Sequence, residues 1–488
     1  CILSRGLGDV YKRQGMDEEL RAFYEYHAMH LEAWDGPAGI VLTDGRYAVC
    51  TMDRNGLRPA RYVISKDRIM TLASESGVTD VPAYNVLSRG RLGPGDMLAV
   101  DTSSGELLMP AAIEDRLKRE QPYLDWLRQG IRNINSEWCD QQGDLEVSDE
   151  TLLVYQKMFQ LSREEMEQVM RVLAEGGQEA GGSMGDDTPL PVFSRRARSI
   201  YDYFRQQFAQ VTNPPIDPLR EKLVMSLQTS FGREQNIFIE DASHAHRVVN
   251  KSPVLSPGEF DYLLGLDDEE YRHARIDLNI GLEAPLEAAL RNICYQAERA
   301  VWSGATLLVL SDRQLLQGRV PVPAALAVGA VHHHLVNTGL RCRSNILVET
   351  ATARNPHEFA VLIGFGATAV YPYLAYQCAA RMAGWSRSTP AQYQRNYRQG
   401  IDKGLYKILS KMGIATIASY RGAQLFEAVG LSREVVDLCF SGVTCRIEGA
   451  GFMQLEACLL YTSDAADDVS TVLMWGVGGA VERGGGGG

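Results

Sequence analysis

One segment decides how this chain is divided: Asn213-Pro-Pro-Ile-Asp-Pro-Leu-Arg-Glu-Lys-Leu-Val-Met-Ser-Leu-Gln-Thr-Ser-Phe-Gly232. Its three prolines hold φ near −65° and predict an extended approach. Asp217 and Pro218 then have the residue types of an N-cap and a first helical position. Apolar residues recur every four positions after them: Leu219, Leu223 and Leu227. The segment therefore predicts a rigid elbow that leads into a docked helix, which Gly232 closes.

Beyond the elbow, short apolar runs alternate with segments of helical pattern. The runs predicted as strands are 305–310, 344–349, 367–371 and 414–418. The segments predicted as helices are 323–336, 356–363 and 393–411. Continuous apolar strands joined by helical crossovers form parallel sheets that are covered on both faces. This half of the chain therefore predicts an α/β domain with a mostly parallel sheet.

The first hundred residues have a different pattern, a helix followed by antiparallel strands. The apolar face of the helix recurs at helical spacing: Leu20, Phe23, Tyr24, His27 and Leu31. Asp44-Gly45 is a hairpin signal between strands 38–43 and 47–52. A second hairpin joins 60–65 to 68–73, and Gly93-Pro-Gly-Asp96 turns into a strand at 97–101. The pattern indicates part of an α+β sheet domain.

Several strings along the chain resemble, in the same order, the large subunit of the glutamate synthase family. The strings begin at Trp34, Asp53, Gly181, Asn213, Ala330, Gly364 and Lys403. The resemblance implies a multidomain α/β and α+β fold. It would contain a remnant of an N-terminal-nucleophile (αββα) glutaminase sheet domain, followed by an α/β central domain with a mostly parallel sheet.

The two ends have a different origin. Residues 9–14 can be encoded by GATGTGTATAAGAGACAG, and the reverse complement of that sequence encodes residues 458–463. Such an inverted repeat is typical of translated sequencing adapters, which are excluded from fold reasoning. We therefore expect five segments: adapter at 1–14, the C-terminal part of a class II glutamine amidotransferase domain at 15–110, a helical connector at 111–190, the central domain at 191–457, and an adapter-derived tail at 458–488.

The resemblance also implies the chemistry of the intact enzyme. It would hydrolyse glutamine and channel ammonia to 2-oxoglutarate, and reduced FMN would reduce the resulting imine to glutamate while a 3Fe–4S cluster relays electrons. Its nucleophile would precede Gly15, and its FMN barrel and cluster cysteines would follow Ala457. We therefore expect this chain to be the connecting part, inactive alone, without catalytic, cofactor-binding or metal-binding residues.

The partners implied are the enzyme's own missing glutaminase and FMN-barrel segments, with an electron-donating small subunit or ferredoxin. Whether NADPH, NADH or ferredoxin donates the electrons stays open. Two alternatives also stay open: a stand-alone α/β scaffold or regulatory protein built from the same domains, and a different class II amidotransferase.

Residues with catalytic potential have plainer explanations. Cys1 has the position of an N-terminal nucleophile but lies in adapter sequence. Asn55-Gly56 has the residue types of an oxyanion hole, yet a tight turn uses the same pair. Arg58 and Arg61 fit an orienting role for that turn. Asp186 and Asp187, next to a Gly-rich loop without the Lys of a phosphate-binding motif, would repel phosphate.

The histidine run and the lysine stripe of the second half also have plainer explanations. Consecutive residues of a helix point about 100° apart, so His332, His333 and His334 do not make a metal site by spacing. Lys403, Lys407 and Lys411 form a stripe on one helix face, either solvated or in contact with an acidic partner or domain. The segment 419–424 is expected to start a helix whose N-terminus could bind an anion.

Composition excludes several classes of protein. The formal net charge of −12 argues against nucleic-acid binding, which usually requires a basic patch. Of the nine cysteines, Cys1 and Cys458 lie in adapter sequence, and the other seven are scattered without a Cys-x-x-Cys pair, which indicates reduced thiols in a cytoplasmic protein. No uncharged apolar run reaches the ~18 residues of a membrane span, so we expect no membrane partner.

Overall fold

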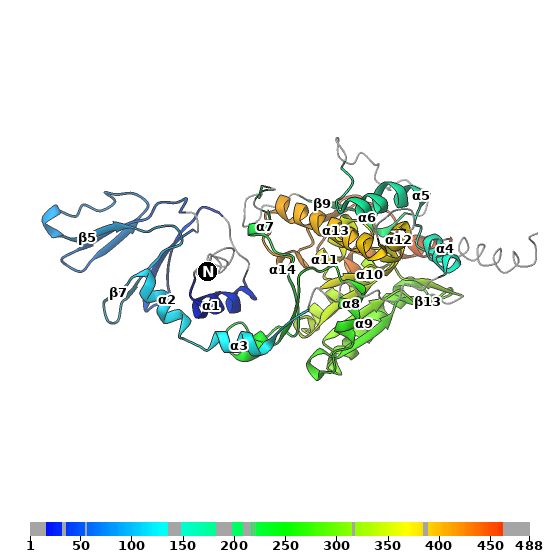
Figure 1. The fold of residues 1–488 in the computed structure, drawn as a ribbon, viewed down its shortest axis with the longest axis horizontal. Helices are drawn as coiled ribbons and strands as arrows, with labels where there is room; N and C mark the ends of the chain where they lie inside the picture. Colours follow the sequence, from blue (N-terminus) through cyan, green and yellow to red (C-terminus); the bar gives the residue numbers. More distant parts are fainter. Residues whose placement is uncertain are drawn as a thin grey trace, which may run out of the picture.

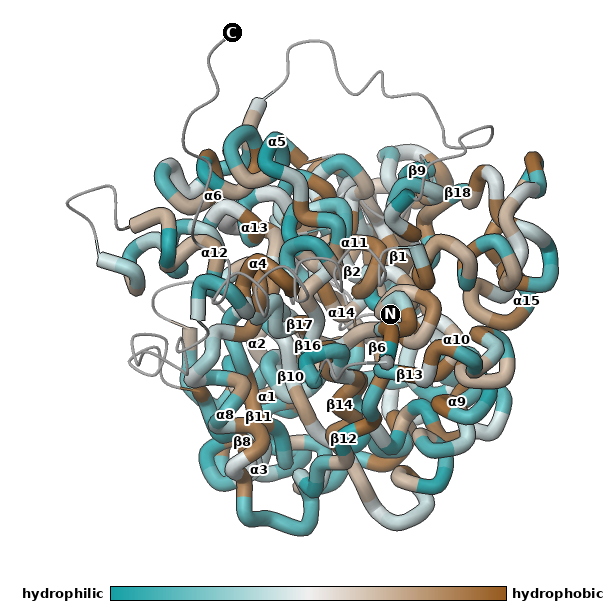
Figure 2. The backbone as a smooth tube through the Cα atoms, turned by 90° about the vertical axis from the view of Figure 1, so that its right-hand side faces the viewer, coloured by the Kyte–Doolittle hydropathy of each residue, from teal (hydrophilic) through white to brown (hydrophobic). Residues whose placement is uncertain are grey.

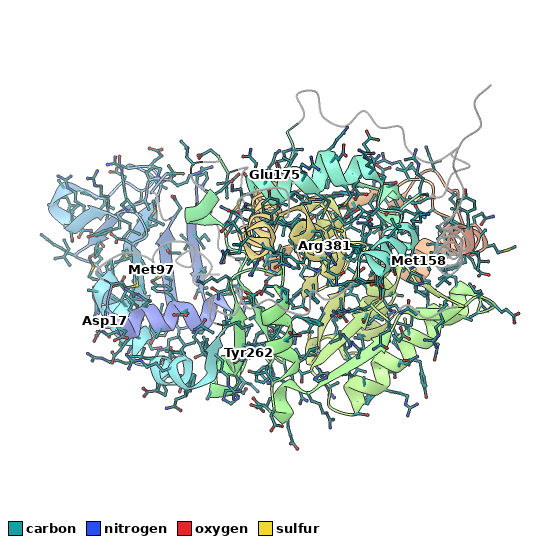
Figure 3. All side chains as sticks on the ribbon, turned by 45° about the vertical axis from the view of Figure 1, so that its right-hand side comes forward. Asp17, Met97, Met158, Glu175, Tyr262 and Arg381 are labelled. Carbon is teal, nitrogen blue, oxygen red and sulfur yellow. The ribbon has the colours of Figure 1, made fainter. Side chains whose placement is uncertain are left out.

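The computed structural model describes residues 16–31, 36–53, 56–134, 148–181, 198–207, 216–217, 219, 221–314, 318–383 and 389–461. These residues form a smaller lobe of strands and a larger body of helices around a sheet (Figure 1). Met97 lies in the smaller lobe, and Tyr262 and Arg381 lie in the larger body (Figure 3). The two patterns of the sequence thus correspond to two regions in space.

The smaller lobe contains two antiparallel sheets, as the hairpin signals predict. The first has the order β1 (Gly39–Thr43), β2 (Tyr47–Met52), β6 (Met97–Asp101), β7 (Glu106–Leu108). The second has the order β4 (Met70–Ala73), β3 (Arg61–Ser65), β5 (Val86–Arg91). Cys50, Met52 and Leu98 of the first sheet share a core with Ala60 and Leu92. Alternating side chains let each sheet bury one face against this core.

Helices α1 (Glu18–Ala28) and α3 (Tyr123–Gly130) join the lobe to the body. Asp17 caps α1, its carboxylate accepting a hydrogen bond from the Leu20 amide at 3.1 Å. The Tyr26 hydroxyl donates to the Asp241 carbonyl at 2.9 Å, and the Tyr123 hydroxyl donates to Glu240 at 2.6 Å. Aromatic rings with polar tips suit such a junction, because one end packs while the other forms hydrogen bonds.

The larger body is built on a parallel sheet with the order β12 (His273–Asp277), β14 (Leu307–Ser311), β16 (Asn345–Glu349), β17 (Ala369–Tyr371). All three pairings are parallel, which confirms the fold class and three of the four predicted strands. The prediction of a strand at 414–418 is wrong. Only Thr416 forms a bridge, with Ser226, and Ile417 then begins the short helix α14. The sheet takes β12 as its edge strand instead.

Long helices cover this sheet: α9 (Leu286–Trp302), α10 (Ala324–Asn337), α11 (Pro356–Gly364), α12 (Tyr373–Met382) and α13 (Pro390–Met412). The predicted helices correspond to α10, α11 and α13. The first eight residues of α10 are all buried because the helix is Ala-rich and apolar all round. Figure 2 shows the hydrophobic β14 in brown, whereas the polar α5 is teal.

The remaining elements are short. The other helices are α2 (Pro110–Lys118), α4 (Asp149–Met158), α5 (Arg163–Glu165), α6 (Arg171–Gly176), α7 (Glu221–Val224), α8 (Pro257–Leu264), α14 (Ile417–Tyr420) and α15 (Arg433–Cys439). The other strands are β8 (Ile131–Asn133), β9 (Phe204–Gln206), β10 (Thr229–Phe231), β11 (Arg247–Asn250), β13 (Asn279–Gly281), β15 (Arg319–Pro321), β18 (Phe426–Ala428) and β19 (Thr444–Cys445). Single 3₁₀ and π turns connect several of them.

The elbow differs from its prediction. Asp217 does start a turn, accepting a hydrogen bond from the Leu219 amide at 3.0 Å. The helix that follows, α7, has only four residues and ends well before Gly232. Leu219 is 92% exposed whereas Leu227 is buried, so they do not share a packed helix face. Beyond α7 the chain is extended, because β10 pairs with β11.

Gly329 allows the packing of α10 against α15 to be tested. A Cβ added to Gly329 would overlap the carbonyl oxygen of Cys439 at the end of α15. Because both atoms belong to packed helices, we expect Gly329→Ala to destabilise the chain by about 1–3 kcal/mol. Gly281→Ala is the matched control, since a Cβ there meets nothing within 4 Å. Urea unfolding followed by circular dichroism measures both; equal stability of the two variants would contradict the α10–α15 packing.

Candidate functional site

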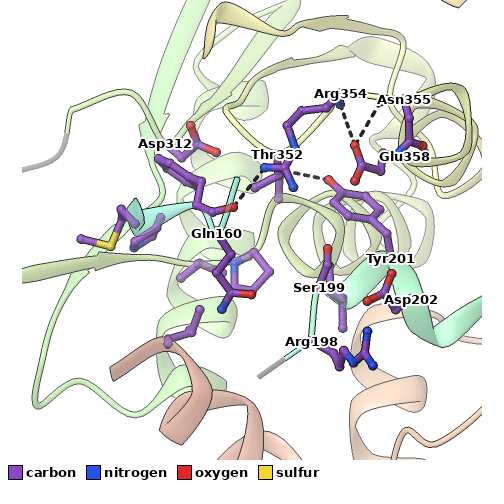
Figure 4. A pocket seen from close by; sticks show the side chains of 18 of the residues that line it. Gln160, Arg198, Ser199, Tyr201, Asp202, Asp312, Thr352, Arg354, Asn355 and Glu358 are labelled. Atoms are coloured by element: carbon purple, nitrogen blue, oxygen red, sulfur yellow. Dashed lines mark hydrogen bonds between the residues drawn. The ribbon is translucent and has the colours of Figure 1, made fainter. Parts of the chain in front are cut away.

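The candidate site is a cavity of about 360 Å³ at the carboxyl ends of β14 and β16 (Figure 4). Ligands of parallel α/β sheets bind at this edge, because the loops that follow the strands converge there. Asp312 follows β14, and Thr352 and Arg354 follow β16. The segment 198–202 supplies the other wall, with Tyr201 pointing toward Thr352.

Asp312 is the buried carboxyl group of this cavity, only 1% exposed. It accepts hydrogen bonds from the Thr350 hydroxyl at 2.5 Å and from the Ala351 amide at 3.1 Å. Burial raises the pKa of Asp312 to about 7, although these hydrogen bonds act in the opposite direction. Asp312 can therefore hold or release a proton near neutral pH.

A chain of hydroxyl groups leads from Asp312 across the cavity. The Thr350 and Thr352 hydroxyls lie 2.9 Å apart, and the Tyr201 hydroxyl lies 2.9 Å from that of Thr352. Each hydroxyl can donate one hydrogen bond and accept others, so the chain can orient in either direction. The fully buried Tyr201 has its pKa raised by desolvation and stays neutral.

Arg354 and Glu358 form a buried ionic group beside the hydroxyl chain. The Arg354 guanidinium donates to Glu165 at 2.7 Å and to the Phe159 carbonyl at 3.0 Å. Glu358 accepts from the Arg354 and Asn355 backbone amides and closes the capping box of α11. Burial disfavours the charged form of Arg354, yet the carboxylates of Glu358 and Glu165 outweigh this effect and raise the pKa of Arg354. Arg354 therefore stays a cation inside the cavity wall.

A second carboxylate anchors the strands beneath the cavity. Glu349, at the end of β16, is completely buried and accepts from the Ser311 hydroxyl at 2.6 Å. Arg313 donates to it at 3.1 Å, and Arg275 of β12 donates to its other oxygen. These contacts tie three neighbouring strands together at the edge where the cavity opens.

The arrangement can hold a small polar molecule and exchange a proton with it. The described residues that line it include neither a cysteine nor a histidine, so they offer no thiol or imidazole for nucleophilic catalysis. The signal that could have found it is the polar residues directly after apolar strands, Ser311-Asp312 and Glu349-Thr350. Tyr201, Glu165 and Arg354 carried no such signal, because they reach the cavity only through tertiary packing.

Four of the residues with catalytic potential lie outside the described residues: Cys1, Asn55, Asp186 and Asp187. Gly56 is described, and its φ of 63° fits the tight-turn explanation. The Asp53 carboxylate holds this turn by accepting from the Leu57 amide at 2.9 Å. Arg58 and Arg61 are exposed and form no ion pair with another described residue.

The three consecutive histidines point to three different partners. His332 accepts from Arg341 at 3.1 Å, His333 lies 2.8 Å from the Gln424 amide nitrogen, and His334 lies 2.6 Å from Glu298. The triplet therefore does not converge on one point. That none of them ligates a metal stays a prediction.

The lysine stripe lies on a helix as expected, whereas no helix starts at 419. Lys403, Lys407 and Lys411 are exposed on α13, and Lys403 donates to the Gly177 carbonyl at the end of α6 at 2.7 Å. The prediction of a helix starting at 419 is wrong, because α14 ends at Tyr420. Gly422 and Gln424 then adopt positive φ angles of 72° and 54°, which turn the chain away from a helix.

Within the described part of the chain, no group of three His, Cys, Asp or Glu side chains is placed to hold a metal ion. Its cysteines are free thiols at scattered positions: Cys50, Cys294, Cys342, Cys378, Cys439, Cys445 and Cys458. Such a donor set does not fit a 3Fe–4S cluster, which requires clustered thiolates. No described helix combines the length and apolar composition needed to cross a bilayer.

Comparison with known proteins gives two family matches along the chain. The family described as class-II glutamine amidotransferases matches residues 9–126, and the glutamate synthase central domain matches residues 154–432. The latter match covers more than half of the chain. This chain therefore belongs to the glutamate synthase family.

Two relatives illustrate the similarity. The chloroplastic ferredoxin-dependent glutamate synthase of Oryza sativa subsp. japonica is 41% identical over 88% of this chain and 28% of its own length. The glutamate synthase [NADPH] large chain of Bacillus subtilis is 40% identical over 94% of this chain and 30% of its own length. The chain thus spans less than a third of these relatives. A solved flavocytochrome b2 matches 29% of this chain and 37% of its own at 15% identity, and its TM-score of 0.24 is too low to support an argument.

The protonation state of Asp312 can be tested by its effect on stability. An unfolded Asp has a pKa near 3.9. Between that value and the folded pKa of about 7, the unfolded chain loses a proton that the folded chain retains. The wild type should therefore lose stability as the pH rises through this window, by at most about 1.4 kcal/mol per pH unit.

Asp312→Asn removes this loss, so its stability relative to wild type should rise from about pH 4 to about pH 7 and then stay constant. Urea unfolding at several pH values measures the difference. Asp437→Asn, the same change at an exposed position, should show no such trend. If the stability of Asp312→Asn relative to wild type instead falls as the pH rises, Asp312 is an ionised, ion-paired carboxylate.

Proposed function

We propose that the full-length protein containing this chain is a glutamate synthase that transfers the glutamine amide nitrogen to 2-oxoglutarate and reduces the product to glutamate. One observation carries this proposal: a class-II amidotransferase match precedes a glutamate synthase central-domain match in a single chain. FMN and a 3Fe–4S cluster would act in segments outside this chain. The electron donor would be a small subunit or ferredoxin, and the compartment the cytoplasm.

The role we propose for the described residues is a rigid connection between the glutaminase and synthase sites. Two features support it. The parallel sheet has an almost fully buried core and is locked at one edge by Glu349. The aromatic junction of α1 and α3 attaches the smaller lobe through Tyr26 and Tyr123. Adjacent buried rings restrict rotation between the two parts, as a spacer between two sites requires.

The boundaries that we propose for the parts of the chain are those expected from the sequence. The amidotransferase part is 15–110, the connector 111–190 and the central domain 191–457, with adapter sequence at 1–14 and 458–488. Of the tail, Tyr461 is described and is 71% exposed, while Leu459 lies against the main core.

For the chain by itself we expect no glutaminase activity, because the proposed nucleophile lies outside it. Cys1→Ala should leave the background rate unchanged. Glutamate release from glutamine by the purified chain, measured in a coupled dehydrogenase assay, tests this expectation. Turnover that disappears in Cys1→Ala would show that Cys1 is a nucleophile after all.

The full-length protein provides the decisive test. With glutamine, 2-oxoglutarate and either reduced ferredoxin or NADPH, it should form two glutamates for each glutamine consumed. Glutamine hydrolysis without reductant-dependent use of 2-oxoglutarate would favour a different class II amidotransferase. Absence of both activities in a folded, flavin-loaded protein would favour a scaffold or regulatory protein.

A further inference from the structure

We propose that Arg341, Arg421 and His332 form a binding site on the larger body for a small oxyanion. The oxyanion would be a carboxylate or a phosphate group. Two motifs that the proposed function leaves without a role meet here. The His332–His334 run lies on α10, and the 419–424 segment follows α14. A Cβ at Gly422 would stand 3.2 Å from the His332 ring, which shows how closely they approach.

Arg421 provides hydrogen-bond donors without acceptors. Its side chain is 24% exposed, and its nearest carboxylate oxygen among the described residues is that of Glu234, 3.9 Å away. Its guanidinium forms no hydrogen bond with the described part of the chain. A guanidinium carries five N–H donors and no acceptor. Three quarters of this side chain is thus removed from water without protein acceptors to replace it.

Arg341 and His332 present further donors at the same place. Arg341 donates to the Ser344 carbonyl at 2.6 Å, to the Gly366 carbonyl at 2.9 Å, and through Nε to Nδ1 of His332. Burial and the charge of Arg341 lower the pKa of His332 to about 3, so its ring is neutral. Since Nδ1 accepts a hydrogen bond, the proton must lie on Nε2, which is then a donor.

The charges of this cluster do not balance. Glu234 is the one carboxylate within ion-pair distance of Arg421 or Arg247 among the described residues, and it lies closer to Arg247, at 3.1 Å. Arg341 has no carboxylate partner there. Arg247 is 2% exposed, and its Nη1 has no hydrogen-bond partner in the described part of the chain. Burial and the neighbouring Arg421 lower the pKa of Arg341 to about 9, as expected for crowded cations.

A cluster rich in donors and positive charge is completed by an anion with several acceptor oxygens. Guanidinium groups recognise carboxylates and phosphates through paired N–H donors. The cluster reaches solvent through its own side chains, because Arg421 is 24% exposed and Arg341 is half-buried. Cys342 lies beside the same cluster, because its carbonyl accepts a hydrogen bond from the Glu234 amide at 2.8 Å. A small oxyanion can therefore enter and bind both guanidinium groups.

Titration calorimetry of the purified chain with inorganic phosphate, and separately with succinate, tests the site at ionic strength held constant with sodium chloride. We expect saturable binding of at least one of them, and the comparison distinguishes phosphate from carboxylate. Arg421→Gln should weaken binding about tenfold, because charge-assisted hydrogen bonds are lost. Arg421→Lys should weaken it less, and Glu234→Gln should strengthen it by removing a competing anion.

Arg446→Gln is the matched control, since Arg446 is 74% exposed and paired with Glu427 elsewhere on the body. It should leave binding unchanged. Absence of saturable binding of either anion, or equal weakening in Arg446→Gln and Arg421→Gln, would overturn the proposal.

A second measurement needs no variant. Arg341 and Arg421 should make Cys342 react with anionic iodoacetate faster than expected from its reaction with neutral iodoacetamide. A bound anion should lower the ratio of these two rates, measured by peptide mass spectrometry, by at least about twofold. A ratio that does not change at anion concentrations that saturate the calorimetric signal would also overturn the site.

Discussion

The burial of one charge, the Glu349 carboxylate, organises the larger body. A carboxylate without water is costly unless charged and hydrogen-bonding groups surround it. Ser311, Arg313 and Arg275 supply those groups from β14, the loop after it, and β12. Strands that are apolar along their length could slide by two residues without changing which face is buried. The polar contacts at their ends define one register, and with it the edge where the cavity lies.

The contacts of Glu349 that fix the strand register therefore also place the residues of the cavity. Asp312 and Thr350 follow directly from strands whose register Glu349 defines, and their hydrogen bond is the first step of the hydroxyl chain. Arg354 extends the same principle, since its charge is held by Glu165 and Glu358 rather than by water. Networks of this kind rigidify a core when every member is satisfied. A rigid body is what a spacer between two remote sites needs.

The arginine cluster follows a different logic from the cavity. In the cavity each buried charge has partners within the described residues, whereas around Arg341 and Arg421 donors exceed acceptors. The paired charges of the cavity stabilise the fold, whereas the unpaired donors around Arg341 and Arg421 require an anion from solution. The same distinction separates His334, paired with Glu298, from His332, whose one hydrogen-bond partner among the described residues is a cation.

The sequence by itself determined the family, the antiparallel hairpins of the smaller lobe, and three strands and three helices of the body. These features depend on residues close together in the chain: turn residues such as Asp44-Gly45, continuous apolar runs, and helix starts such as Asn355-Pro356. A signal for the position of the cavity was also present in the sequence, because polar residues, Asp312 and Thr350, directly follow apolar strands.

Tertiary structure alone decided the rest. Leu219 and Leu227 have helical spacing, but pairing of β10 with β11 draws the chain out before a helix can include both. The run at 414–418 is as apolar as a strand, yet it lies beside Ser226 rather than beside β17. Tyr201 and Glu165 reach the cavity, and Arg421 reaches His332, only by long-range packing. Local patterns record the preferences of neighbouring residues, whereas these contacts join residues many positions apart, which only the packed core brings together.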